Sequence, residues 1–167
     1  MTVSGDVISI KSELLKISNK GGAKKIFAEA KKFDDLISNF ENIPDAYFGL
    51  WLDILSDPEL YNKQGMHVFV MNLQICMHAL SEDQKEGALH AILSHYSNYN
   101  NLDTCWHVGD LIARCYKMQK ALNCFKILFP ASTEQGRKGI ALGLDVLRRQ
   151  DKGAKSKRMI EQILRGD

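Results

Sequence analysis

The chain has 167 residues, 45% of them apolar and 25% charged, so its size and composition fit one globular domain and argue against disorder over most of its length. Its first residues contain no basic segment followed by an unbroken apolar run, and its longest apolar stretch, 66–80, is interrupted by four polar side chains. We therefore expect a cytoplasmic protein with no membrane partner. Its four cysteines should be reduced thiols, because they form no paired framework: Cys76, Cys105, Cys115 and Cys124.

Apolar residues recur at helical spacing along almost the whole chain, and alternating strand patterns are nearly absent. The first predicted helix covers 22–40 and ends before Ile43-Pro44, because a residue that precedes proline is pushed out of the helical region. Asp57-Pro58 predicts the capped start of a short helix, and Ser81 with Gln84 predicts a capping box. The remaining predicted helices are 45–55, 65–80, 81–96, 103–117, 119–129, 133–149 and 154–165. Of these, 65–80 is the most apolar, and we expect it to be central.

We predict an all-α single domain, 1–167, of eight or nine short antiparallel helices. A helical-repeat stack is one form of such a fold. GLWLDIL at 49–55 aligns without a gap to GALHAIL at 87–93, and the 38-residue offset is near the period of HEAT-type repeats. Residues 105–130 resemble a tetratricopeptide unit, since Gly109, Ala121 and Phe125 stand at that family's spacing, although Ile112 replaces an expected aromatic. We interpret 105–130 as a degenerate helical hairpin.

The patterns that would indicate catalysis or a cofactor are incomplete. Five histidines lie between His67 and His107, but none are spaced to share a metal ion on one helix face. KGGAKK at 20–25 lacks the spacing and the hydroxyl residue of a phosphate-binding loop. No nucleophile elbow is present. We therefore expect no enzyme activity, no cofactor and no metal.

Charge is distributed unevenly along the chain. Residues 1–32 carry +4, 33–111 carry −10 and 112–167 carry +8, which predicts a basic N-terminal arm, an acidic middle and a basic C-terminal third. The stretch 33–62 contains seven acidic residues and no Lys or Arg. Carboxylates crowded within about 8–10 Å repel one another unless basic side chains of the same chain, or of a partner, offset them. The predicted partner-binding residues are Asp34, Asp35, Glu41, Asp45, Tyr47, Asp53, Asp57, Glu59, Tyr61, Glu82, Asp83 and Glu86.

In architecture and charge the chain resembles the helical immunity proteins of bacterial toxin systems, such as those of contact-dependent growth inhibition. The resemblance implies a compact, non-enzymatic protein that binds one cognate toxin domain in a 1:1 complex. It further implies that the toxin domain is basic, often a nuclease, and that acidic side chains cover its substrate cleft. The overall basic balance does not favour this hypothesis. The alternatives are a helical-repeat adaptor or secretion chaperone, a nucleic-acid-binding domain that uses the basic C-terminal third, and an unrecognised enzyme. For that third we favour an ordinary solvated surface, so direct nucleic-acid binding is not expected.

Overall fold

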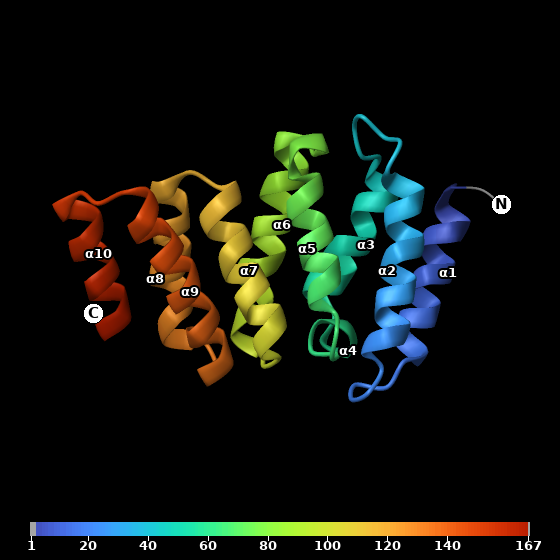
Figure 1. The fold of residues 1–167 in the computed structure, drawn as a ribbon, viewed down its shortest axis with the longest axis horizontal. Helices are drawn as coiled ribbons and strands as arrows, with labels where there is room; N and C mark the ends of the chain where they lie inside the picture. The colour runs from blue at the N-terminus through green and yellow to red at the C-terminus, as the bar shows by residue number, and fades with distance from the viewer. Residues whose placement is uncertain (1–2, 167) are drawn as a thin grey trace. The chain divides into compact units, whose positions relative to one another are not determined.

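The computed structural model describes residues 3–166, and over this range the chain is helical, with ten α-helices, two short 3₁₀ helices and no strand (Figure 1). The prediction of an all-α fold is confirmed. The predicted number of helices was too low by at least one, because Val3–Lys16 forms a helix, α1, that the sequence analysis did not assign. Its apolar stripe of Val7, Ile10 and Leu14 is buried.

Backbone contacts group the chain into two compact units, Met1–Ser94 and His95–Asp167. We refer to them as unit 1 and unit 2. The boundary does not coincide with the change of charge along the sequence, because the acidic middle continues to residue 111. Unit 1 contains thirteen acidic and nine Lys or Arg residues, a formal charge of −4, and unit 2 contains seven and thirteen, a formal charge of +6.

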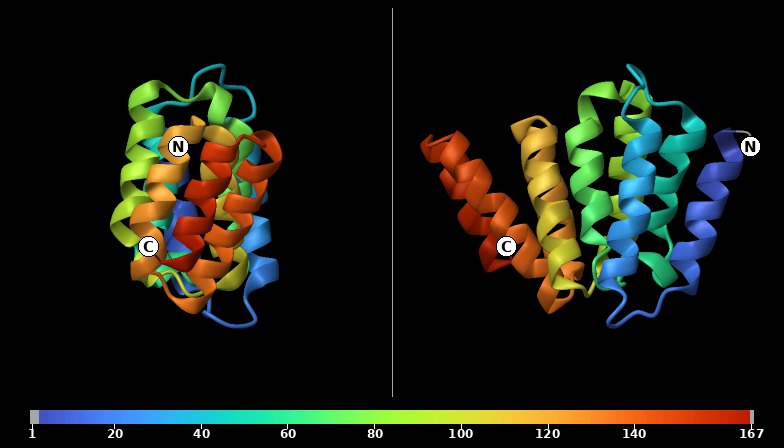
Figure 2. Two further views of the ribbon diagram at one scale, coloured as in Figure 1. Left: turned by 90° about the vertical axis from the view of Figure 1, so that its left-hand side faces the viewer. Right: turned by 45° about the vertical axis from the view of Figure 1, so that its right-hand side comes forward.

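Unit 1 is built from packed helices, and the successive long helices alternate in direction along the chain (Figures 1 and 2). Trp51 is at the centre of its core. The indole N–H donates to the carbonyl oxygen of Phe69 at 3.1 Å, and the rings of Phe33 and Phe48 pack against it. The elements of unit 1 are α1 (Val3–Lys16), α2 (Ala23–Ile37), α3 (Asp45–Ser56), α4 (Pro58–Tyr61), α5 (His67–Ile75), η1 (Cys76–Ala79) and α6 (Glu82–His95).

Two predicted helix starts in unit 1 are confirmed in detail. The Asp57 side chain accepts a hydrogen bond from the Glu59 backbone N–H at 2.9 Å, and Pro58 is the first residue of α4. The capping box is reciprocal: the Ser81 N–H donates to Oε1 of Gln84 at 3.0 Å, and the Gln84 N–H donates to Oγ of Ser81 at 3.1 Å. Both signals are local in sequence, which is why they could be predicted.

The expectation that 65–80 forms one central helix was wrong. The segment divides into α5 and the 3₁₀ turn η1, and α5 is buried only along one side. Phe69, Val70 and Leu73 belong to the core, whereas Met71 is 41% exposed and Ile75 is 70% exposed. Composition showed that the helix is apolar but not that one apolar face would remain uncovered.

In unit 2, α7 and α9 cross closely, because glycines, which have no side chain, stand where the two helices touch. A Cβ atom on Gly139 would lie 2.3 Å from the carbonyl oxygen of Cys105, and one on Gly109 would lie 2.1 Å from that of Gly139. The Tyr96 hydroxyl donates to the carbonyl oxygen of Gly136 at 2.7 Å. The elements of unit 2 are η2 (Tyr96–Asn98), α7 (Leu102–Cys115), α8 (Met118–Ala131), α9 (Glu134–Gln150) and α10 (Ala154–Arg165).

The tetratricopeptide-like segment 105–130 does form two consecutive helices, α7 and α8, and buries Ala121 and Phe125. Gly109, however, faces α9 rather than α8. The closest packing in this region therefore joins α7 to the helix after the predicted hairpin. Pro130 does not end α8, which continues for one more residue.

Candidate binding surface

Two stretches that are separate in sequence, 43–45 and 79–84, meet at one end of unit 1. The backbone N–H of Ile43 donates to the carbonyl oxygen of Ala79 at 3.0 Å, which joins the α2–α3 connection to η1. Nε2 of Gln84 donates to the carbonyl oxygen of Ile43 at 2.9 Å and to Oδ1 of Asp45 at 2.8 Å. Gln84 is 7% exposed, so one buried amide connects the N-terminus of α6 to that of α3.

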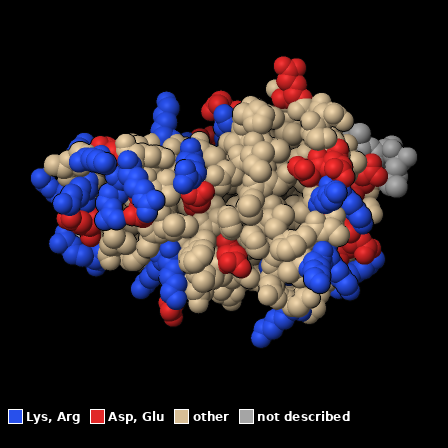
Figure 3. All heavy atoms as spheres, viewed as in Figure 1, with Lys and Arg blue, Asp and Glu red and all other residues tan. Residues whose placement is uncertain are grey.

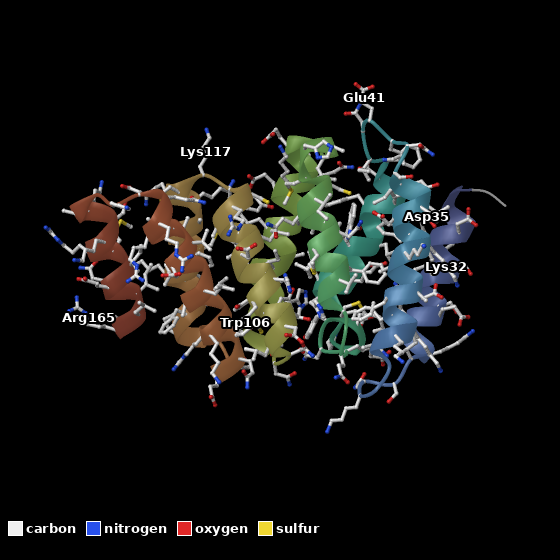
Figure 4. All side chains as sticks on the ribbon, viewed as in Figure 1. Lys32, Asp35, Glu41, Trp106, Lys117 and Arg165 are labelled. Atoms are coloured by element: carbon white, nitrogen blue, oxygen red, sulfur yellow. The ribbon has the colours of Figure 1, made fainter. Side chains whose placement is uncertain are left out.

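The C-terminal part of α2 lies at the same end, where Nδ2 of Asn72 donates to Oδ1 of Asp34 at 2.9 Å. Figure 4 shows Asp35 on α2 and Glu41 projecting from the α2–α3 connection near this end. We call the carboxylate-bearing surface formed here the acidic end. It contains seven of the predicted partner-binding residues: Asp34, Asp35, Glu41, Asp45, Glu82, Asp83 and Glu86.

The acidic end contains little positive charge of its own. Between residues 33 and 62 there is no Lys or Arg, and between 78 and 86 the one cation is Lys85, which pairs with Glu82 at 3.1 Å. Asp35, Glu41 and Asp83 are exposed and form no ion pair with a described residue. The red atoms at the tip of the α2–α3 connection and over the upper part of α2 are visible in Figure 3.

The charges of α2 oppose its helix dipole. Lys24 and Lys25 are in its first turn, where the dipole is positive, and Asp34 and Asp35 are in its last turn, where the dipole is negative. Each such placement costs an exposed helix about 0.3–1 kcal/mol at low ionic strength. A basic partner at the C-terminal end of α2 would offset both the dipole and the repulsion between carboxylates.

The remaining predicted residues do not belong to the acidic end. Asp53 pairs with Lys11 at 3.1 Å, so its charge is already offset within unit 1. Asp57 and Glu59 lie at α4, at the opposite end, where the Gln64 N–H donates to the carbonyl oxygen of Asn19 at 3.1 Å. That contact places them beside the α1–α2 connection, around which four lysines gather: Lys16, Lys20, Lys24 and Lys25.

Tyr47 and Tyr61 are corrections to the predicted site. They are 3% and 2% exposed, so neither can offer a ring to a partner. Tyr47 packs against Phe40, with ring centroids 4.9 Å apart, and burial raises the pKa of Tyr61. Both were predicted because aromatic residues are frequent at interfaces, but here they supply core area instead.

Two surface depressions adjoin the acidic end. Between α1 and α2 is a recess of about 310 Å³, lined by the carboxylates of Asp6, Glu29 and Asp35 and by Lys32, whose ammonium pairs with Glu29 at 2.6 Å. Between α2 and α5 is a groove of about 280 Å³ with mainly apolar walls. Neither depression was predicted from the sequence, because each forms between helices whose relative positions depend on tertiary packing.

Within the described part of the chain, no three His, Cys, Asp or Glu side chains are grouped so as to hold a metal ion. None of the described helices is long and apolar enough to cross a membrane. Burial and the nearby Asp34 carboxylate raise the pKa of the Cys76 thiol, so this cysteine beside the acidic end is not an activated nucleophile. Neither a protein-family model nor a curated protein nor a solved structure matches the chain.

Proposed function

We propose that the chain is a non-enzymatic protein-binding module whose acidic end docks on a basic partner. In its most specific form it is an immunity protein that neutralises a cognate basic toxin domain of nuclease type, in a 1:1 complex in the cytoplasm. The observation that carries the proposal is the convergence of seven carboxylates from the last turn of α2, the α2–α3 connection and the first turns of α3 and α6, segments that together contain one lysine.

The composition of this surface supports recognition of a cationic cleft. A nuclease binds phosphates through Lys and Arg side chains, and carboxylates arrayed at comparable spacing can occupy the same positions. The recess between α1 and α2 is lined by three carboxylates and one lysine, and two of the carboxylates, Asp6 and Glu29, are additional to the acidic end; it suits the entry of a Lys or Arg side chain from the partner. Unit 1 has a net charge of −4, so within about one Debye length, roughly 8 Å, the field at the acidic end attracts a basic protein although the whole chain is basic.

Three exposed carboxylates make the sharpest test, because changing them breaks no described ion pair. In the charge-reversed triple variant, Asp35→Lys, Glu41→Lys and Asp83→Lys, the acidic end loses most of its potential. The matched control reverses three exposed carboxylates elsewhere, Glu59→Lys, Asp103→Lys and Glu161→Lys, and so changes the net charge by the same amount. Circular dichroism verifies that both variants remain helical.

Wild type and both variants, immobilised, are exposed to lysate of the cell of origin. Retained proteins are quantified by mass spectrometry, and any basic protein recovered is purified and its affinity measured by calorimetry. We expect wild type and the control to bind it equally, and the acidic-end variant to bind at least about tenfold more weakly, with a reduced dependence on salt. If the acidic-end variant binds as tightly as wild type, the proposal is wrong. A nuclease partner should also lose its activity when one equivalent of the chain is added.

Unit 2 supports nucleic-acid binding as a second candidate function. Lys155, Lys157 and Arg158 occupy the first turns of α10, where the helix dipole is also positive, and form no ion pair with a described residue. Phosphates would offset that accumulation of positive charge. In Figure 3, blue atoms gather over α8–α10. This candidate predicts binding to a short RNA or DNA duplex that falls steeply between 50 and 200 mM salt (about 10³-fold or more for six phosphate contacts).

A further inference from the structure

Helix α5 presents a solvent-exposed face that contains no charged residue. Its sequence, HVFVMNLQI, includes no Lys, Arg, Asp or Glu. Val68, Met71 and Ile75 form a stripe at helical spacing, and Met71 and Ile75 are 41% and 70% exposed. Exposed faces of surface helices ordinarily carry charged and polar residues. In Figure 3 the surface over α5 is tan, the colour of residues other than Lys, Arg, Asp and Glu.

This stripe forms one wall of the groove between α2 and α5. The other wall comes from α2, where Phe27 is 43% exposed and stands with Ala30, Lys31 and Asp34. The two helices run in the same direction along the groove. His67 packs edge-on against Phe27 with ring centroids 6.0 Å apart, and Asn72 meets Asp34 further along. Val68 therefore lies toward the Phe27 end and Ile75 toward the Asp34 end.

The charges along the α2 wall change sign from one end of the groove to the other. Lys24, Phe27, Lys31 and Asp34 share one face of α2 and span roughly 15 Å. Neither lysine forms an ion pair with a described residue. Beyond Asp34 the wall continues into the acidic end. The groove is thus apolar along its length, positive at the Phe27 end and negative at the Asp34 end.

We propose that this groove binds an amphipathic helix of the partner, about ten residues long. The positively charged end of that helix lies beside Asp34, and its negatively charged end lies beside Lys24 and Lys31. Apolar side chains at positions i, i+4 and i+7 of that helix cover Phe27, Met71 and Ile75. The positively charged end of the partner's helix reaches the acidic end of unit 1. The inference therefore rests on the proposed function, and it adds which segment of the partner is recognised and in which direction that segment lies.

Asn72 joins the two walls of the groove. It lies on α5 and is 8% exposed, and its Nδ2 donates to Oδ1 of Asp34 on α2 at 2.9 Å. This hydrogen bond holds the α5 wall against the α2 wall at the negative end of the groove.

The test uses a synthetic probe and therefore does not need the natural partner. The probe is a sixteen-residue helical peptide with leucines at i, i+4, i+7 and i+11, glutamates at one end and lysines at the other. Its binding is followed by ¹³C-methyl NMR of the chain. A second peptide of the same composition has its leucines scrambled around the helix. A third version of the first peptide carries a nitroxide at the lysine end.

We expect saturable binding of the probe below about 1 mM, shifts at the Val68, Met71 and Ile75 methyl groups, and no binding of the scrambled peptide. The nitroxide should broaden the Ile75 methyl signal more than that of Val68. The Met71→Gln, Ile75→Gln double variant should bind at least about tenfold more weakly. The matched control is Ile127→Gln in α8, since Ile127 is 67% exposed and lies outside the groove; its affinity should equal that of wild type.

Four outcomes would overturn the inference: absence of saturable binding, equal binding of the scrambled peptide, stronger broadening at Val68, or a loss in the Ile127 variant as large as in the double variant. A concentration-dependent dimer that the double variant abolishes would show instead that a second copy of the chain covers the groove. The substitutions at the acidic end lie outside the groove. The peptide titration tests the groove and the charge-reversal assay tests the acidic end, so a failure of either one leaves the other valid.

Discussion

The Gln84 amide holds the acidic end together, and its conversion to a carboxyl group is an informative perturbation. Gln84→Glu preserves the shape of the side chain and the oxygen that accepts from the Ser81 N–H. It removes the N–H₂ group that donates to Ile43 at 2.9 Å and to Asp45 at 2.8 Å. In place of that donor, a second negative charge faces Asp45.

The expected magnitude follows from those two contacts. Leaving the buried Ile43 carbonyl oxygen without its donor costs about 1–3 kcal/mol, and loss of a hydrogen bond to the charged Asp45 costs about 1.5 kcal/mol or more. Asp45 is exposed, so solvent screens much of the new repulsion. We therefore expect the free energy of unfolding to fall by about 3 kcal/mol at pH 7.5.

The loss should depend on pH with a defined sign. Burial and the Asp45 carboxylate raise the folded-state pKa of the introduced carboxyl group above its value of about 4.3 in the unfolded chain. Its neutral form can donate a hydrogen bond, so the folded variant is stabilised below the unfolded-state pKa and loses that stability as the pH rises through the folded-state pKa. The difference from wild type should be small at pH 4 and largest above pH 7.

Urea denaturation followed by far-ultraviolet circular dichroism, at pH values from 4 to 8, measures this difference. The control is Gln119→Glu in α8, because Gln119 is exposed and, among the described residues, its side chain bonds only to Asn123, at 3.0 Å; a change within about 0.5 kcal/mol is expected. A destabilisation of Gln84→Glu below 1 kcal/mol at pH 7.5, or one independent of pH, would refute the role assigned to this amide.

Two further predictions compare a residue of unit 2 with one of unit 1. Gly139→Ala places a Cβ atom 2.3 Å from the carbonyl oxygen of Cys105, so α7 and α9 must separate, and we expect a loss of about 3 kcal/mol or more in urea denaturation. Gly49→Ala in α3 meets no atom within 4 Å and should instead stabilise by about 0.5–1 kcal/mol; equal effects would contradict the packing argument. Burial raises the pKa of the Cys105 thiol to about 12, so at pH 8 only about one molecule in 10⁴ carries the thiolate. Iodoacetamide labelling, resolved by mass spectrometry, should therefore modify the half-buried Cys76 well before Cys105, and comparable rates would be inconsistent with that burial.

The sequence predicted features that depend on neighbouring residues. The cap at Asp57 and the capping box at Ser81 are decided within one turn of helix, so the sequence contains the whole signal. Helix α1 was not predicted, although Val7, Ile10 and Leu14 have helical spacing; its residues were predicted only as part of the basic N-terminal arm, 1–32.

The candidate site was predicted in part. The sequence showed an excess of carboxylates between 33 and 86, and we predicted that they form one surface. The structure separates Asp57 and Glu59 from the acidic end, pairs Asp53 with Lys11 and buries Tyr47 and Tyr61. Which end of a helix a residue occupies follows from its position in the chain, but which helix ends meet depends on packing.

Periodicity and capping residues by themselves determined that this chain is helical and where most of its helices begin, because hydrogen bonds within a helix and the side chains that cap it are local. Tertiary structure alone decided that the carboxylates of α2, α3 and α6 gather at one end and that the apolar stripe of α5 remains exposed beside α2. Those features depend on which helix faces contact each other, and an amphipathic pattern shows that a face is apolar without showing what covers it.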